Sequence, residues 1–113
     1  MTLKETDVRD CAEGYKATNG TVIRTILAQW KCSRFTWRDL INVLGAYKID
    51  KADVMESMLV FDEAGYIIVK ERSTGRQVSL WDYTDAISDV EFMLAKKGRD
   101  VAYDITADPA VTF

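Results

Sequence analysis

Hydrophobic residues in the first half of the chain recur at intervals of three and four, which places them on one face of a helix. This spacing predicts helices over 2–17, 20–32, 36–46 and 50–64. Asn19 followed by Gly20 predicts a break between the first two. Thr36 and Asp50 stand where the third and fourth helices should begin, and both residue types cap helix N-termini.

The pattern changes after Gly65, a residue type that commonly ends a helix in the left-handed conformation. Residues 66–69 and 77–81 are rich in β-branched and aromatic side chains, and residues 73–76 between them are typical of a turn. These runs predict an antiparallel β-hairpin. A further helix is predicted over about 84–97, ended by Gly98 and followed by a tail.

Three helices followed by a hairpin give the element order of a winged helix-turn-helix. The spacing of Met58, Phe61, Gly65, Tyr66 and Ile67 resembles the end of the recognition helix in winged-helix regulators. The resemblance implies an α+β, mostly helical fold, in which a winged-helix core carries extra N- and C-terminal helices. We therefore expect an N-terminal helical extension, the core, a C-terminal helix and a tail, over 1–19, 20–82, 83–98 and 99–113.

Composition narrows the classes of function. The chain has 113 residues, two cysteines and no histidine, so histidine-dependent catalysis and His-ligated or four-cysteine zinc sites are excluded. It also lacks the glycine-rich motifs GxxxxGK[ST] and GxGxxG that cradle phosphates. We expect neither an enzyme nor a cofactor or metal. The sequence contains no apolar stretch of membrane-spanning length and no signal-peptide pattern, which predicts a cytoplasmic protein without a membrane partner.

The net charge of −3 is unevenly distributed along the chain. Residues 20–81 hold nine basic and seven acidic side chains, a sum of +2, whereas residues 82–113 hold three and seven, a sum of −4. A DNA-binding surface needs local rather than total positive charge. The core is therefore compatible with binding to double-stranded DNA.

The resemblance to winged-helix regulators also implies which positions contact DNA. In that superfamily the early turns of the third core helix read bases, the hairpin touches phosphates or the minor groove, and residues flanking the second core helix touch the backbone. The DNA contacts implied are Arg34, Arg38, Lys51, Ser57, Lys70, Arg72 and Arg76. Asp53 and Glu56 share the base-reading turns and depart from the pattern, because carboxylates repel phosphates and rarely read bases.

The helix predicted over 84–97 carries more apolar residues than a single stripe against a small core would need. We expect these residues to form a homodimer interface, made by Ile87, Val90, Phe92, Met93 and Leu94. Two functions remain open at this point. One is a small cytoplasmic DNA-binding regulator of transcription. The other is a protein–protein interaction module, an adaptor or a DNA mimic. Acidic residues in the helix over 50–64, the third core helix, are compatible with that function.

Overall fold

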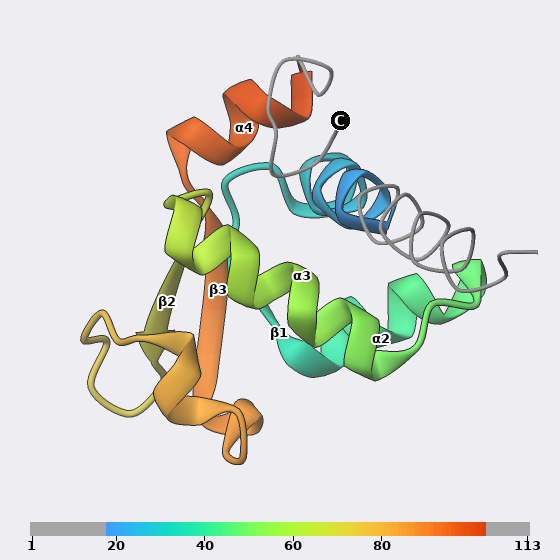
Figure 1. Ribbon diagram of the computed structural model, residues 1–113. Helices are drawn as coiled ribbons and strands as arrows, with labels where there is room; N and C mark the ends of the chain where they lie inside the picture. Colours follow the sequence, from blue (N-terminus) through green and yellow to red (C-terminus); the bar gives the residue numbers. More distant parts are fainter. Residues whose placement is uncertain (1–17, 104–113) are drawn as a thin grey trace, which may run out of the picture.

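The computed structural model describes residues 18–103, which form four helices and a three-stranded antiparallel sheet (Figure 1). The first helix covers 18–30 within this range. It is followed by β1 (Phe35–Thr36), α2 (Trp37–Leu44), α3 (Lys51–Ala64), β2 (Ile67–Glu71), β3 (Val90–Leu94) and α4 (Lys96–Tyr103). Short 3-10 turns occur at Gly45–Tyr47 (η1), Leu80–Tyr83 (η2) and Ile87–Asp89 (η3). The helix predicted over 2–17 lies outside the described residues.

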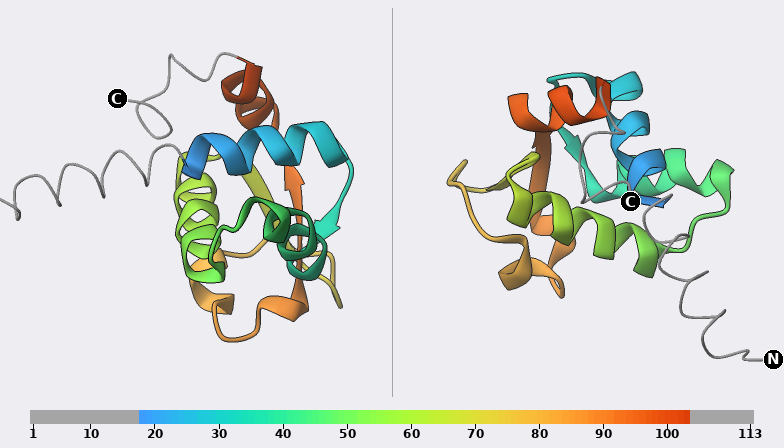
Figure 2. Two further views of the ribbon diagram at one scale, coloured as in Figure 1. Left: turned by 90° about the vertical axis from the view of Figure 1, so that its right-hand side faces the viewer. Right: turned by 45° about the horizontal axis from the view of Figure 1, so that its top comes forward.

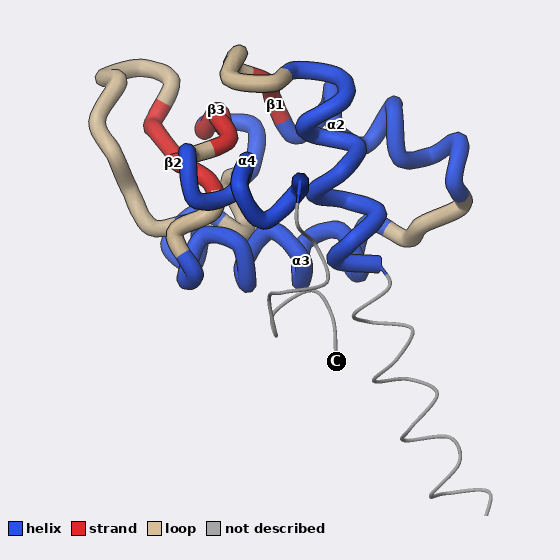
Figure 3. Tube along the Cα trace, turned by 90° about the horizontal axis from the view of Figure 1, so that it is seen from above, coloured by secondary structure: helices blue, strands red, loops and turns tan. Residues whose placement is uncertain are grey.

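The sheet has the strand order β1-β3-β2, and both neighbouring pairs are antiparallel. β2 and β3 pair over five residues, from Ile67 opposite Leu94 to Glu71 opposite Val90. β1 adds two residues at the other edge of β3. Viewed from above, α3 runs along one side of the three strands (Figure 3). The fold is the winged helix-turn-helix expected from the sequence, with four helices and a three-stranded antiparallel sheet.

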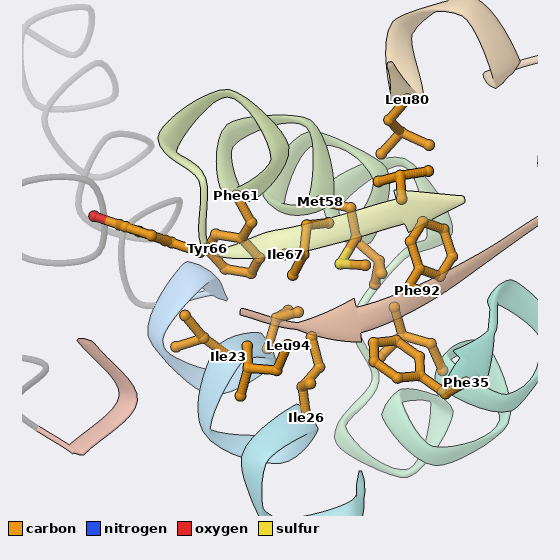
Figure 4. Close-up of a cluster of buried hydrophobic side chains, with 14 of the residues drawn as sticks. Ile23, Ile26, Phe35, Met58, Phe61, Tyr66, Ile67, Leu80, Phe92 and Leu94 are labelled. Atoms are coloured by element: carbon orange, nitrogen blue, oxygen red, sulfur yellow. The ribbon is translucent and has the colours of Figure 1, made fainter. Parts of the chain in front are cut away.

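The core lies between the inward face of the sheet and the helices (Figures 2 and 4). Ile23 and Ile26 of the first helix, Met58 and Phe61 of α3, and Phe92 of β3 are all fully buried. The ring of Phe35 stacks on that of Trp30 at 4.4 Å between centroids and lies 5.6 Å from that of Phe92. Burying side chains of this size contributes about 1.5–3 kcal/mol each, so these residues hold the helices to the sheet.

The predicted start of α2 and the predicted end of α3 are confirmed. Thr36 caps α2 through a reciprocal pair of bonds: its hydroxyl accepts from the backbone of Asp39 at 3.2 Å, and the Asp39 carboxylate accepts from the Thr36 backbone at 3.0 Å. Gly65 ends α3 with a φ of +79°, where a side chain would be strained. Asp50 stands at the N-cap position of α3 but makes no side-chain cap bond.

The break predicted at Asn19 and Gly20 is wrong, because residues 18–20 are helical and continuous with the first helix. Asn19 is buried, and its side-chain oxygen accepts a 2.5 Å hydrogen bond from the hydroxyl of Ser57 on α3. This tertiary partner satisfies an amide that would otherwise favour a turn, so local propensity is overridden.

The predictions for residues 77–97 are also wrong. The strand that returns from β2 is Val90–Leu94, and in the predicted return run Gln77 forms only an isolated bridge with Lys70. Residues 90–94 are therefore a strand and not part of a helix, and α4 begins only at Lys96. Gly98 lies inside α4, where an added Cβ would come within 2.1 Å of the Tyr66 carbonyl oxygen. Glycine there permits close packing of α4 on the start of β2 and does not end a helix.

No helix within residues 18–103 is long and apolar enough to span a membrane.

Candidate nucleic-acid interface

The wing is the segment from Arg72 to Asp89 that joins β2 to β3. The first residues of the wing turn back along β2. The Glu71 amide donates to the Arg76 carbonyl at 2.8 Å, and the Val78 amide donates to the Val69 carbonyl at 2.9 Å. Gly75 in the turn has a φ of +73°. The tight turn predicted over residues 73–76 is therefore present, although the strand predicted to follow it is not.

Hydrogen bonds from Thr74 and Tyr83 to Glu71 connect two parts of the wing to the end of β2. The Tyr83 hydroxyl donates to Oε2 of Glu71, and the Thr74 hydroxyl donates to Oε1 at 2.8 Å. The bond from Tyr83, followed by that from Thr74, lowers the pKa of Glu71 below its ordinary range. The same bond raises the pKa of Tyr83 above its ordinary range. Glu71 is thus ionised at neutral pH, and its charge is turned toward the wing's own donors.

Two further hydrogen bonds tie the wing to α3. The backbone of Leu80, a fully buried residue, donates to Oδ2 of Asp62 at 3.0 Å. The indole Nε1 of Trp81 donates to Oε1 of Glu63 at 2.8 Å, and Trp81 as a residue is 56% exposed. The wing is therefore positioned relative to α3 by backbone and side-chain contacts.

Arg72 and Arg76, two of the predicted DNA contacts, are both exposed on the wing. Arg72, at the start of the wing, is bonded to the residues at its end. The Arg72 backbone donates to the Asp89 carbonyl at 2.8 Å, and its guanidinium donates to the Ser88 carbonyl at 3.2 Å. Together with Glu71, Ser73, Ser88 and Asp89, Arg72 lines an open hollow at the base of the wing. A guanidinium positioned in this way keeps further N–H donors for a phosphate.

Arg34 and Lys70 lie together on the outward face of the sheet, next to the wing. Glu91 stands opposite Lys70 in the β2–β3 ladder, and its carboxylate accepts from the Arg34 guanidinium at 3.1 Å. The Arg34 side chain is 68% exposed. A small pocket between Arg34, Lys70 and Glu91 continues over the apolar side chains of Ile68 and Met93. The structure therefore places Arg34 and Lys70, two of the predicted phosphate contacts, on the two sides of Glu91.

The remaining predicted DNA contacts lie on helices α2 and α3. Arg38 is exposed in the first turn of α2, and Lys51 is exposed at the first residue of α3. The prediction for Ser57 is wrong, because its side chain is fully buried and bonded to Asn19. Ser57 faces the first helix and cannot reach a base while the domain is folded.

The outward face of α3 is acidic and partly apolar. Ala52, Glu56, Leu59 and Glu63 follow one another at intervals of four, three and four residues, on the side opposite the buried Phe61. Residues 50–66 contain five acidic side chains and one basic side chain. The acidic residues are Asp50, Asp53, Glu56, Asp62 and Glu63, and the basic residue is Lys51. A DNA groove presented to this face would meet repulsion along most of the helix.

The predicted dimer interface is wrong in its stated form. Val90, Phe92 and Leu94 are at most 1% exposed and belong to the monomer core, while Ile87 and Met93 are half-buried. Alternation along β3 points Phe92 inward and Met93 outward, so the five residues share no exposed helix face. Two copies could not meet through the buried members of this set without unfolding.

Sequence reasoning missed Asp62, Trp81 and Tyr83 as residues that shape the wing. The sequence predicts Trp81 within a strand, and no local pattern shows that its indole bonds to Glu63. Asp62 and Glu63 are ordinary last-turn acids of a helix until the wing folds over them. Only the tertiary path of the wing reveals their role.

No protein-family model and no curated protein sequence matches the chain. Comparison with solved structures finds a double mutant of Lactococcus lactis ZitR in its apo form, with a TM-score of 0.52 and 18% sequence identity. The match covers 95% of this chain and 72% of that chain. ZitR is a winged-helix transcriptional regulator of the MarR family. At this level of identity the likeness concerns the fold, so the chain shares the winged-helix architecture with ZitR.

Proposed function

We propose that this chain is a small cytoplasmic DNA-binding protein, a regulator of transcription, that contacts the duplex through its wing. The observation that carries the proposal is the positioned wing with two exposed arginines. The Arg72 guanidinium donates to the carbonyl of Ser88, and Arg76 is exposed on the turn that follows β2. A rigid wing that presents arginine forks suits contacts to phosphate oxygens.

Arg34 and Lys70 extend the basic groups from the wing onto the sheet. Strand alternation places Lys70 on the outward face and turns Glu71 to the opposite side, where Tyr83 binds it. Glu91 offsets part of this charge through Arg34. The contact surface is therefore modestly basic, and the affinity for DNA should be moderate and strongly dependent on salt.

The acidic face of α3 makes base reading in the major groove an unsuitable role for this helix. Direct readout uses arginine, lysine, asparagine or glutamine, whereas α3 offers Asp53 and Glu56 at its exposed early turns. Sequence preference in this proposal comes from the wing and from the shape of the DNA.

The test is a fluorescence-anisotropy titration of a random-sequence duplex at two salt concentrations. The double variant Arg72→Ala/Arg76→Ala should lose affinity for all sequences alike. Lys96→Ala/Lys97→Ala is the matched control, because it also removes two positive charges but from α4, at the opposite end of the sheet from the wing (Figure 1). Absence of salt-dependent binding by the wild type, or equal losses in both variants, would refute the proposal.

A protein–protein interaction module is the second candidate, and the acidic outward face of α3 favours it. The homodimer is also still a prediction, although the five residues predicted for its interface do not form an exposed face. Light scattering at high protein concentration measures it, and a monomer mass would count against it.

A further inference from the structure

The outward face of α3 continues onto the wing through Trp81. Glu63 accepts the indole hydrogen bond of Trp81 and lies three and four residues after Val60 and Leu59. We name the group Glu56, Leu59, Val60, Glu63 and Trp81 the α3–Trp81 face. Figure 1 shows α3 at the front of the molecule, in view along its length. Acidic and apolar side chains alternate along this face within the described residues.

Trp81 is held in a fixed place on the surface. Its neighbour Leu80 is fully buried, and the Leu80 backbone is bonded to Asp62. Its indole nitrogen is bonded to Glu63, yet Trp81 as a residue is 56% exposed. A large aromatic ring that is both exposed and immobilised loses little conformational freedom on binding. This property is common among the residues that dominate binding energy at protein interfaces.

Leu59 and Val60 contribute the aliphatic part of the face. Both residues pack on the core, and both remain partly exposed. Leu59 lies between Glu56 and Glu63 on the helix surface because it is three and four residues from them. A ligand lying along α3 would therefore meet carboxylates and aliphatic groups in turn.

The charge of the face selects the kind of partner. Residues 50–66 hold five acidic side chains against one basic side chain, and Asp82 follows Trp81 directly. A phosphate backbone would be repelled here, whereas lysine or arginine would be attracted. A cation can also lie over the exposed Trp81 ring, which is the best side chain for such a contact. Charge complementarity thus points to a basic polypeptide.

We propose that the α3–Trp81 face is the docking site for a basic segment of a partner protein, in which lysine or arginine alternates with apolar residues. The basic groups pair with Glu56 and Glu63, one of them covers the ring of Trp81, and the apolar groups lie on Leu59 and Val60. The proposal goes beyond DNA binding and uses residues that are separate from Arg72 and Arg76. It stands or falls independently of the wing's function.

The experiment uses the full chain and a fluorescein-labelled peptide composed of lysine, arginine and leucine. We expect the wild type to bind the peptide and the affinity to fall as salt is raised. The same peptide with glutamate in place of every lysine and arginine should not bind. In a ¹H–¹⁵N spectrum, the indole signal that disappears in Trp81→Ala should be the one of the three tryptophan indole signals that the basic peptide shifts.

Variants separate this face from the rest of the surface. Trp81→Ala should weaken peptide binding about tenfold or more, as removal of a central aromatic anchor does. Tyr47→Ala is the matched control, because Tyr47 is 57% exposed and Trp81 56%, but Tyr47 belongs to η1. The charge variant Glu56→Gln/Glu63→Gln keeps side-chain size and should also weaken binding. It tests the idea even if Trp81→Ala loosens the wing.

Several results would overturn the proposal. They are equal binding of the basic and acidic peptides, equal losses in Tyr47→Ala and Trp81→Ala, or a peptide affinity that Glu56→Gln/Glu63→Gln leaves unchanged. Self-association that Trp81→Ala abolishes without any peptide would show that a second copy of the chain occupies the face. Competition by duplex DNA that survives in Arg72→Ala/Arg76→Ala would assign the face to nucleic acid.

Discussion

The wing and the outward face of α3 are joined by two hydrogen bonds, yet they differ in the properties that decide what they bind. The wing presents Arg72 and Arg76 and turns the carboxylate of Glu71 inward. The α3–Trp81 face presents carboxylates, aliphatic groups and one exposed indole. In a winged helix that reads bases, the helix and the wing act on one ligand. Here the two surfaces suit ligands of opposite charge, so the architecture alone does not assign the function.

The largest effect should come from weakening the strand that supports both regions. Phe92 is fully buried in β3, so Phe92→Ala should lower the free energy of unfolding by about 3–5 kcal/mol in a urea titration. Its neighbour Met93 points to the outward face of the sheet, and Met93→Ala is the control with a much smaller decrease. Similar decreases in the two variants would contradict the placement of this segment as a strand.

Ser57 tests whether the inner side of α3 is purely structural. Ser57→Ala removes the donor to buried Asn19 and should destabilise the domain by about 1–3 kcal/mol. Binding to duplex DNA should not change at temperatures where both proteins are folded, because Ser57 is fully buried. A decrease in DNA affinity without a decrease in stability would return Ser57 to the role of a base-reading residue.

The link between the two regions can be cut at Asp62. Asp62→Ala removes the acceptor of the Leu80 amide, which should cost about 1 kcal/mol and speed hydrogen exchange at Leu80. Asp85→Ala changes an exposed wing acid and serves as the control. If exchange at Leu80 is the same in Asp62→Ala and the wild type, the wing is not held to α3 by this bond.

The smallest effect concerns the wing's own closure and its dependence on pH. The Tyr83 bond lowers the pKa of Glu71, so this contribution is present above the ordinary glutamate range and is lost as pH falls through the lowered pKa. The pKa of Tyr83 is raised by the same bond, so its contribution is present below the ordinary tyrosine range and is lost as pH rises through the raised pKa. The amide signals of Thr74 and Arg76 should therefore move at both extremes. Tyr83→Phe should abolish the alkaline change, and an alkaline change that persists in this variant would show that another group causes it.

Local signals are enough to predict the helical part of the fold. The cap formed by Thr36 and Asp39 and the left-handed Gly65 depend on residues close in sequence, so the sequence indicates them directly. The sequence defines less clearly which side of α3 faces the core, because the apolar spacing also allows Met55 on the inner face. That orientation turns Ser57 toward solvent, whereas packing buries Ser57 and leaves Met55 half-buried. Placing Met55 on the inner face thus puts Ser57, a predicted DNA contact, on the solvent side, whereas Ser57 is on the buried side.

The pairing of β2 with β3 could not be predicted, because a long segment separates the two strands in the sequence. Val90, Met93 and Leu94 recur at intervals of three and one, which fits a helix, but Val90, Phe92 and Leu94 also alternate as in a strand. Pairing with β2 decides for the strand, and that pairing is not visible in the local sequence. The contacts of Asp62, Glu63 and Trp81 depend on the same long connection, so the sequence does not reveal these site residues either.

The most direct test of the division between the two surfaces is one set of duplex-DNA titrations over a range of salt concentrations. Arg72→Ala/Arg76→Ala should weaken binding and reduce the salt slope by about one for each phosphate that the variant no longer neutralises. Glu56→Gln/Glu63→Gln removes two negative charges from the other surface and should strengthen binding, because it relieves repulsion. Opposite changes in the two double variants are the predicted result. If DNA affinity is unchanged in the first variant, or falls in the second, the assignment of phosphate contacts to the wing and of repulsion to α3 is wrong.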